Sequence, residues 1–359
     1  MTMFWYEQKA ENKDVVVSTR VRLARNLREY PFAARLSEEK ASEIVSRLSL
    51  LYKDKEGYSL TDMRDISRIE AESLCERHYI SREFAQSTAP RLLITEEKKN
   101  IAIMVGEEDH LRIQCLKNGL ALDEAFEETM NQEKFLDSQL SFAYHESLGY
   151  LTHCPTNLGT GMRISVMIHL PALTMLGHMD VLRQQLQKLG VAVRGMQGEG
   201  SRADAALYQI SNQVTMGITE AETLQKMKEI VTQMSERERA ARASFNEETK
   251  EKLLDSAQRA EGILRSARMI SSSEFLTLYN SARLGCTIGN TSALSCDLLD
   301  RLLFAVMPAT MALAGYRDAE SSLPKEMQRD KNRAILIQNA ITARDRSVAR
   351  KSKKASENA

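Results

Sequence analysis

Arginine residues at short spacing are the first feature of this sequence with a clear chemical use. The stretch STRVR at residues 18–22 has the alternation of a strand, which places Arg20 and Arg22 on one face of a sheet. Two guanidinium groups side by side repel each other unless an anion or carboxylates lie between them. The pattern fits an anion-binding surface, and it equally fits a solvent-exposed strand face.

The stretch CPTNLGTGMR at residues 154–163 is a second candidate for anion binding. Its glycines would let backbone N–H groups approach an anion closely, and Arg163 could close over that anion. Glycine-rich turns beside strands are also common without a ligand, and a lone cysteine such as Cys154 is by default a small buried thiol. The loop alone does not establish a site.

Two further stretches place acidic residues close to an arginine. GEEDHLRIQ at residues 106–114 has three acids in a turn followed by Arg112 on the next predicted strand, and RGMQGEG at residues 194–200 carries Arg194 and Glu199. Acidic turns are usually only solvated, and glycine-rich loops are usually only connections. Each stretch is therefore ambiguous when it is taken by itself.

Taken together, the four stretches closely resemble the motifs of guanidino kinases, and more narrowly those of bacterial protein-arginine kinases. They occur in the family's order, ISNQ follows at residues 210–213, and the resemblance runs over nearly the whole chain. It implies ATP and Mg²⁺ as cofactors, catalytic roles for Glu108 and Glu199, and a place for Cys154 in the active-site loop. It implies no metal-ligating residues. The ATP-binding residues that it implies are Ser18, Arg20, Arg22, Arg112, Arg163 and Arg194.

Phosphoryl transfer to an arginine side chain explains why such residues are needed. Arginines and Mg²⁺ neutralise the charge spread over the phosphates, so that catalysis rests on positioning and electrostatics. A guanidinium has a pKa above about 12, so its nitrogens are protonated and not nucleophilic at neutral pH. Glu108 and Glu199 would hold the guanidinium in line and draw off a proton, one mainly as base and the other mainly as clamp.

Two features favour the protein-arginine branch of the family. Kinases of small guanidino metabolites resemble this catalytic domain but carry a helical domain before it, whereas STRVR here begins at residue 18. We therefore expect a pocket open enough for an arginine on another protein. Small-molecule kinases also usually have an adenine-contacting histidine where this chain has Met167.

The C-terminal region resembles the domain that is peculiar to protein-arginine kinases. Its sequence RDKNRA at residues 329–334 implies a phosphoarginine receptor formed by Arg329, Asp330 and Arg333. A spacing of four residues places the two arginines on one helix face, where they could fork a phosphate while the aspartate accepts hydrogen bonds. The alternative is an ordinary solvated helix face.

Two positions depart from the family pattern. Gly106 stands where the family usually has asparagine, which removes a side-chain amide that could fix the turn holding Glu108. Arg202 stands at a commonly acidic position of the loop that bears Glu199. We expect these changes to affect loop closure or substrate preference.

The periodicity of the chain predicts the elements that position these residues. Short β-rich runs fill the chain up to about residue 215, with a hairpin of RLLI and IAIMV and a third strand HLRIQC. Residues 121–138 and 172–189 have the spacing of amphipathic helices. We predict an α+β fold, a mostly antiparallel sheet flanked by helices over residues 1–240, followed by an all-helical domain over residues 241–359. The charged stretch SERERAARASFNEETKEK is expected to be a solvated helix end and linker.

Composition excludes several classes of partner. The 359 residues include 49 basic and 49 acidic ones, so no overall field favours nucleic acid or membrane. The five cysteines form no CxxC pair, and the charged N-terminus is unlike a signal peptide. Both features favour reduced thiols in a cytoplasm.

The resemblance implies a homodimer that phosphorylates exposed arginines with an activator protein and protease machinery, in stress response and protein quality control. A protein would thereby be marked for degradation, or a repressor regulated. The alternatives are a non-catalytic phosphoarginine reader and a kinase of a small guanidino metabolite.

Overall fold

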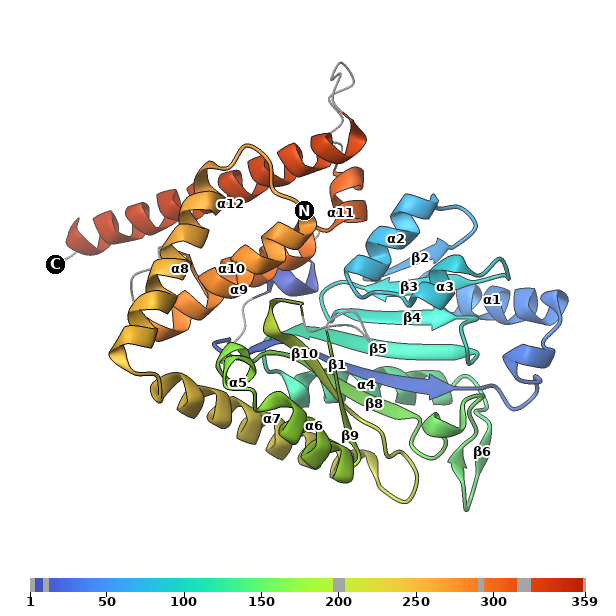
Figure 1. The fold of residues 1–359 in the computed structure, drawn as a ribbon. Helices are drawn as coiled ribbons and strands as arrows, with labels where there is room; N and C mark the ends of the chain where they lie inside the picture. The colour runs from blue at the N-terminus through green and yellow to red at the C-terminus, as the bar shows by residue number, and fades with distance from the viewer. Residues whose placement is uncertain (1–3, 9–12, 196–203, 290–293, 315–323, 358–359) are drawn as a thin grey trace.

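A single antiparallel sheet forms the centre of the molecule. The structure, a computed structural model, describes residues 4–8, 13–195, 204–289, 294–314 and 324–357. Its eight-stranded sheet has the order β2-β3-β4-β5-β1-β8-β10-β9 (Figure 1). The strands are β1 (Val16–Arg25), β2 (Tyr58–Asp62), β3 (Leu92–Glu96), β4 (Ile101–Val105), β5 (Leu111–Asn118), β8 (Met162–His169), β9 (Val191–Gly195) and β10 (Leu207–Asn212), and a separate hairpin pairs β6 (Tyr144–His145) with β7 (Gly149–Tyr150). The predicted α+β class is confirmed, as is the predicted hairpin, which is β3 and β4 with β5 beside them.

One face of the sheet is covered by helices that form a first apolar core. Val21 and Leu23 of β1 point into it, next to Ile164 of β8 and Ile113 of β5. Helices of the first two thirds of the chain supply the rest of this core: α1 (Glu38–Tyr52), α4 (Leu122–Asp137), α5 (Pro171–Met175), α6 (Met179–Lys188) and α7 (Glu220–Ala243). The period-two alternation of the strands thus leaves every second side chain on the opposite face.

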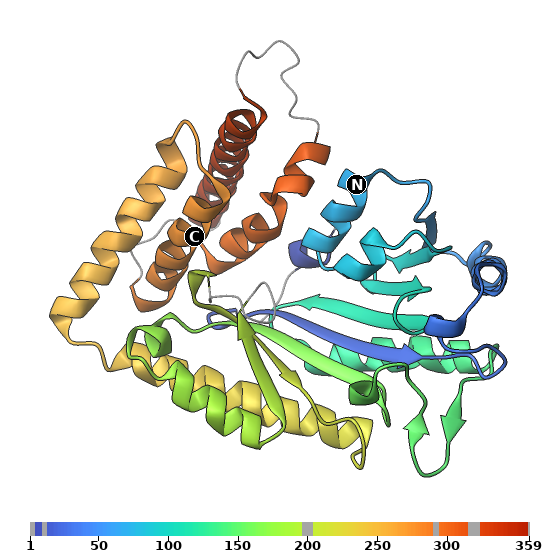
Figure 2. The same ribbon diagram turned by 45° about the vertical axis from the view of Figure 1, so that its right-hand side comes forward.

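The C-terminal helices pack against that opposite face. Strand residues such as Val17, Met104 and Leu116 form a second core with residues of these helices, among them Phe304. Figures 1 and 2 both show α8 to α12 on the side of the sheet away from α4 and α7. The helices on this side are α2 (Arg68–Glu76), α3 (Arg82–Gln86), α8 (Glu247–Ser266), α9 (Ser272–Ile288), α10 (Cys296–Ala305), α11 (Pro308–Leu313) and α12 (Lys325–Glu357). The catalytic sheet and the helical region therefore share one continuous core.

Short helical turns and one break between helices complete the fold. The predicted helix over residues 121–138 is confirmed as α4, whereas the predicted helix over 172–189 is divided into α5 and α6 around Gly177, whose φ is 71°. The 3-10 turns are η1 (Trp5–Glu7), η2 (Ala33–Arg35), η3 (Pro155–Asn157) and η4 (Asp204–Ala206). Within the described ranges, no helix has both the length and the apolar composition needed to cross a membrane.

The charged stretch at residues 235–252 contains the expected helix end and linker, but it is not solvated throughout. Helix α7 ends at Ala243, α8 begins at Glu247, and the side chain of Glu238 in α7 is fully buried. Its carboxylate accepts hydrogen bonds from the N–H groups of Ala172 (3.1 Å) and Leu173 (3.0 Å) and from Nε of Arg242 (2.8 Å). A buried charge at this place is stable because it is paired and also caps the start of α5.

A buried polar network joins the C-terminal helices to β8. The fully buried guanidinium of Arg283 in α9 donates to Asp300 of α10 (2.8 Å) and to the backbone carbonyls of Lys13 (2.7 Å) and Asp14 (3.1 Å). It also lies 3.1 Å from Nδ1 of His169, the last residue of β8. Since the guanidinium can only donate, Nδ1 accepts, and Nε2–H of the histidine faces Asn280 Oδ1 at 2.8 Å.

Burial and the adjacent Arg283 keep His169 neutral, because both lower the pKa of its imidazole well below the usual value. The network therefore contains one ion pair, Arg283 with Asp300, and one neutral ring that completes the hydrogen bonds of the guanidinium. Breaking such a buried pair leaves an uncompensated charge in the core.

Replacing Arg283 with methionine is expected to lower the free energy of unfolding by about 3–5 kcal/mol, because Asp300 then loses its buried partner. Urea denaturation followed by circular dichroism measures the change. Arg301→Met is the matched control, since Arg301 is a partly exposed α10 residue paired with Asp297, and its loss should cost about 1 kcal/mol or less. Equal urea midpoints for the two variants would contradict a stabilising role for the buried network.

Candidate active site

The five predicted arginines lie on the face of the sheet opposite the first core. Register places Arg22 of β1 directly opposite Arg163 of β8, and Arg20 lies two residues before Arg22. Arg112 of β5 points to the same side, because it pairs with Ala24, two residues after Arg22 on β1. Arg194 of β9 does so too, because its partner Gln209 on β10 also pairs with Met167, which lies on the arginine side of β8. The predicted common face for Arg20 and Arg22 is thus observed.

Burial and mutual repulsion lower the pKa values of two arginines in this cluster. Burial, followed by repulsion from Arg112 and Arg163, lowers the pKa of Arg20 to about 10. Burial and the neighbouring arginines also lower the pKa of Arg22. In addition, Arg22 Nε and Ser165 Oγ are buried without a hydrogen-bond partner among the described residues. A bound polyanion would accept those hydrogen bonds and offset the repulsion, so the surface fits a phosphate chain.

The acidic turn between β4 and β5 contains two glutamates with different environments. The Glu107 carboxylate is buried and accepts from Arg112, from Ser81 Oγ (2.7 Å) and from the N–H of Glu108 (2.7 Å). The Glu108 side chain is 37% exposed and accepts one bond, from Arg112 Nη2 at 3.2 Å. Glu107 therefore positions Arg112, while Glu108 remains accessible to a substrate. Sequence reasoning missed Glu107, because adjacent glutamates in a turn carry no signal of which one is buried.

The same turn is tied to the end of β1 and to the next loop. Asp109 Oδ1 accepts from Asn26 Nδ2 (2.6 Å) and from the N–H of His153 (2.7 Å). His110 Nδ1 accepts from the N–H of Leu27 at 3.0 Å, so its Nε2–H donates to a backbone carbonyl, and burial lowers the pKa of this ring. These bonds fix the turn without the asparagine side chain that the family usually supplies.

Gly106 itself is required by the backbone. Its φ is +84°, a conformation that strongly favours glycine, and a Cβ there would lie 2.9 Å from the carbonyl oxygen of Pro90. Its N–H donates to the carbonyl of His110 at 2.9 Å, which closes the turn between β4 and β5. The departure from the family pattern is therefore compatible with an ordered acidic turn.

The glycine loop of residues 154–161 forms the other wall of the site. At Gly159 (φ +108°) a Cβ would lie 2.2 Å from Thr215 O, and at Gly161 (φ +59°) it would lie 2.7 Å from Ala24 O, so both glycines are required by close backbone approach. Cys154 is half-buried, and its thiol lies 3.0 Å from Thr156 Oγ1. The cavity between this loop and the arginine face has a volume of about 470 Å³, and its charged and thiol-bearing lining residues are Arg22, Glu108, Arg112, Cys154, Arg163 and Arg194.

Arg25 supports the glycine loop from behind. Its fully buried guanidinium donates to Ala24 O (2.8 Å) and Thr160 O (2.9 Å) and pairs with Glu133 at 3.1 Å. The guanidinium carbon also lies 3.4 Å from the ring centroid of Tyr150, whose hydroxyl donates to the same glutamate at 2.9 Å. Arg25 thus connects the loop to α4, a role that its neighbours Arg20 and Arg22 obscure in the sequence.

Two of the expected nucleotide-binding residues do not line the cavity. Ser18 is buried on the arginine side of β1, and neither it nor Arg20 lines the cavity. Glu199 and Arg202 lie outside the described residues, so the second carboxylate and the altered loop position stay predictions. The structure adds His78, which sequence reasoning missed. Burial, then Arg20 and Arg22, lowers the pKa of His78 to about 3, so this ring beside the arginines is neutral at physiological pH.

The C-terminal motif has a different geometry from the expected pair of ligand-facing arginines. Arg333 is buried, and its guanidinium donates to Val306 O (3.0 Å), to Ile270 O (2.7 Å) and to the carboxylate of Asp330. Arg329 is exposed, and Asp330 is half-buried. The two arginines therefore do not present one joint face. Arg333 is held inward because it satisfies carbonyls at the start of α9 and the end of α10, and it orients Asp330.

These features define a class of protein: a phosphotransferase of the guanidino kinase class with an added helical domain. The family model described as ATP:guanido phosphotransferase, C-terminal catalytic domain, matches residues 39–241. The model described as protein-arginine kinase McsB C-terminal domain matches residues 250–355. The solved structure of the duplicated taurocyamine kinase from Schistosoma mansoni is similar, with a TM-score of 0.56 and 25% identity over 64% of this chain and 33% of that chain.

Relatives named protein-arginine kinase match almost the entire chain. The one from Caldanaerobacter subterraneus subsp. tengcongensis is 38% identical over 305 residues, which cover 84% of this chain and 90% of the relative. The one from Syntrophomonas wolfei is 38% identical over 340 residues, which cover 93% of each chain. This chain belongs to the protein-arginine kinase family, and the family resemblance of its motifs is confirmed.

The support that Arg25 gives to the glycine loop leads to a prediction. Arg25→Lys keeps the charge beside Glu133 but loses the fork to two carbonyls and the planar contact with Tyr150, so the loop should shift. We expect phosphoryl transfer to fall about 100-fold, the usual cost of a small misplacement, while ATP affinity changes only a few-fold. Stopped-flow kinetics and calorimetric ATP titration measure the two quantities. Arg68→Lys, at an 89% exposed position on α2, is the control, and wild-type transfer in both variants would remove Arg25 from any positioning role.

Proposed function

We propose that this protein transfers the γ-phosphoryl group of ATP to arginine side chains exposed on other proteins. The observation that carries the proposal is the convergence of four arginines, Glu108 and the glycine loop on one cavity. The relatives' name, protein-arginine kinase, supplies the acceptor class.

The arginine cluster is suited to bind and neutralise the phosphates. Burial, followed by repulsion from neighbouring arginines, lowers the pKa values of Arg20 and Arg22, and the buried Nε of Arg22, which has no partner among the described residues, is a donor that a phosphate oxygen would satisfy. Arg112 is held in place by Glu107 and is the one cluster member with two carboxylate partners among the described residues. Its charge is thus partly balanced before the nucleotide binds.

Mg²⁺ fits this site as a companion of the nucleotide. No three His, Cys, Asp or Glu side chains in the described part of the chain are grouped to hold a metal. A magnesium ion here would be bound mainly by phosphate oxygens and water, and Glu108 is the carboxylate that lines the described part of the cavity. When bound, it would supply neutralisation of phosphate charge during transfer.

Glu108 is the described group that can act on the acceptor. An arginine guanidinium in the cavity would be oriented by this carboxylate, which takes up a proton from Nη as that nitrogen attacks the γ-phosphorus. An N–P bond forms, the bond from phosphorus to the β–γ bridging oxygen breaks, and ADP leaves with the electron pair. Glu199 is proposed as the second carboxylate on the acceptor.

The cellular role that we propose follows from the product. Phosphoarginine on a protein would mark that protein for degradation or alter a repressor during stress, with an activator protein and protease machinery as partners of a cytoplasmic homodimer. The family match of the C-terminal domain supports the receptor part of this scheme. Co-purification of phosphoarginine-bearing proteins from cells, with and without an active kinase, tests it.

Glu108→Gln is expected to reduce transfer about 100- to 10,000-fold, because the amide cannot accept the acceptor's proton. ATP affinity should stay within a few-fold of the parent value, since Arg112 keeps its ion pair with Glu107. Turnover is measured by mass spectrometry of an arginine-rich protein under conditions that preserve the P–N bond, and binding by calorimetry. Glu146→Gln, at an exposed position outside the cavity, is the control. Transfer rates within a few-fold of the parent in Glu108→Gln would falsify its role as base.

A separate prediction concerns the proposed phosphoarginine receptor. Arg329→Ala should weaken binding of a phosphoarginine peptide by about 1.5–3 kcal/mol, the usual value of a charge-assisted hydrogen bond. Because Arg329 is exposed, the fold should be unaffected, whereas Arg333→Ala should also destabilise the protein. Lys331→Ala, exposed in the same helical turn, is the matched control in fluorescence titrations. Equal peptide affinity for the Arg329 and Lys331 variants would reduce the motif to a structural element.

A further inference from the structure

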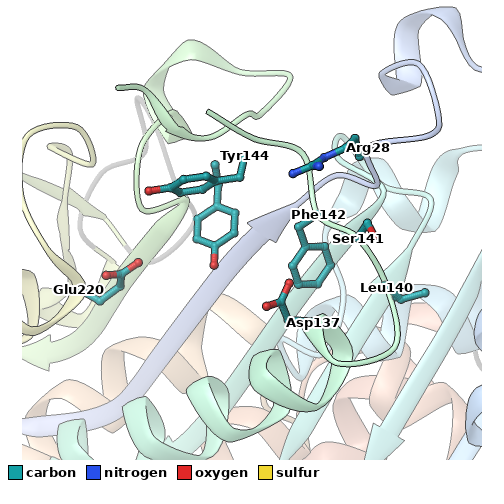
Figure 3. A pocket seen from close by; sticks show the side chains of 8 residues that line it. Arg28, Asp137, Leu140, Ser141, Phe142, Tyr144 and Glu220 are labelled. Atoms are coloured by element: carbon teal, nitrogen blue, oxygen red, sulfur yellow. The ribbon is translucent and has the colours of Figure 1, made fainter. Parts of the chain in front are cut away.

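A second cavity lies behind the glycine loop, at the same end of the sheet as the arginine cluster. Its volume is about 560 Å³, and its walls come from the end of α4, the segment before β6, the hairpin and the first residue of α7 (Figure 3). A smaller hollow of about 320 Å³ shares Tyr144, Tyr150 and Glu220 with it and extends to Gly159 and Thr160. The next residue, Gly161, lines the arginine-bearing cavity, so a single loop separates the two sites.

The walls of this second cavity are aromatic and acidic. Tyr144 is 50% exposed and meets Tyr150 edge to face, with ring centroids 5.2 Å apart and an interplanar angle of 75°. The carboxylates of Asp137 and Glu220 approach from two different helices, and Figure 3 shows them with the tyrosine in one view of the cavity. An exposed aromatic face flanked by carboxylates is the surface that binds organic cations. Arg28 contributes one positive charge to the lining and can donate to a peptide carbonyl.

Tyr150 already binds a guanidinium on one side. Arg25 lies over its ring at 3.4 Å, and the backbone of Tyr150 exchanges hydrogen bonds with Gly159, at 2.7 Å for its own N–H. A group in the second cavity therefore touches residues whose backbone and ring directly hold the glycine loop of the first.

We propose that this cavity binds a second, non-reacting basic side chain of the same polypeptide whose acceptor arginine enters the first cavity. This inference rests on the proposed function and specifies its substrate class. The carboxylates of Asp137 and Glu220 favour a cationic ligand. Because one loop separates the two cavities, a single polypeptide could occupy both. A polypeptide can place one basic side chain in each cavity, so the kinase prefers arginines that have a basic neighbour.

Peptide pairs test this preference. Each peptide carries one arginine in a neutral sequence, with lysine or glutamine at a second position scanned about two to eight residues away, because an extended chain covers about 3.3–3.6 Å per residue. Lysine keeps the charge but offers no guanidinium to phosphorylate. At the favoured spacing, kcat/KM should be about five- to thirty-fold higher for the lysine peptide, mainly through KM.

Variants of the cavity provide the decisive comparison. Asp137→Asn, Glu220→Gln and Tyr144→Ala should each bring the lysine-to-glutamine ratio toward one. Glu127→Gln, an exposed carboxylate of α4 outside the cavity, should keep the parent ratio. A ratio of one at every spacing in the parent, or a full ratio in all three cavity variants, overturns the proposal.

Failure of the proposed function is distinguishable from failure of this inference. If neither peptide is phosphorylated, the proposed kinase activity is contradicted. Fluorescence anisotropy of the labelled peptides still measures their binding to the second cavity. Tighter binding of the lysine peptide to the parent, lost in the three variants and kept in Glu127→Gln, supports the second site. Equal binding of the two peptides to the parent overturns it.

Discussion

Mutual repulsion of arginines on one sheet face is the constraint around which this molecule is organised. Arg22 and Arg163 are cross-strand partners, an arrangement that is unfavourable between like charges. The opposite face compensates, because Val21 and Leu23 of the same strand are fully buried in the first core. The strand is held by its apolar half while its charged half faces the cavity. An anion that binds the folded protein therefore also stabilises it.

The C-terminal helices act on the same sheet face and are not an independent appendage. Phe304 of α10 lies edge to face on His78 at 5.4 Å, and burial, followed by repulsion from Arg20 and Arg22, lowers the pKa of that ring to about 3. Arg283 of α9 donates a hydrogen bond to His169. His169 is the last residue of β8, the strand that carries Arg163 near its start. Movement of α9 or α10 would thus change the contacts of His78 and of the end of β8, two elements of the sheet face that carries the arginine cluster. This is a physical route for coupling between a ligand on the helical domain and the catalytic sheet.

Sequence patterns predicted the sheet and most of the arginine face for a simple reason. Period-two alternation alone fixes which side of a strand a residue faces, so Arg20 and Arg22 could be placed together without tertiary information. Whether a charged residue is buried depends on what packs over it, and composition contains no record of that. Glu107 and Glu108 are adjacent and chemically identical, yet one is buried beneath Arg112 and the other faces the cavity. Glu238 lies in a segment that appeared solvated, because its partners at α5 are far away in the sequence.

The same limit explains Arg333 and Gly106. Helical spacing correctly relates Arg333 to Arg329 along the chain, but carbonyls of two other helices draw its guanidinium inward. In the sequence, Gly106 indicated the loss of a useful side chain. In the structure, its positive φ and the nearby Pro90 carbonyl leave no room for a side chain at this position. In both cases the deciding contact comes from a segment distant in sequence.

The glycine loop separates two surfaces of opposite charge in a chain with equal numbers of acidic and basic residues. On one side the arginine cluster attracts a polyanion, and on the other Asp137, Glu220 and Tyr144 favour a cation. Under the function and the second site proposed above, the nucleotide and a basic polypeptide would be held on opposite sides of one loop. That loop is also the segment that Arg25 and Tyr150 fix from behind, so the element between the two ligands is among the most rigidly supported parts of the site.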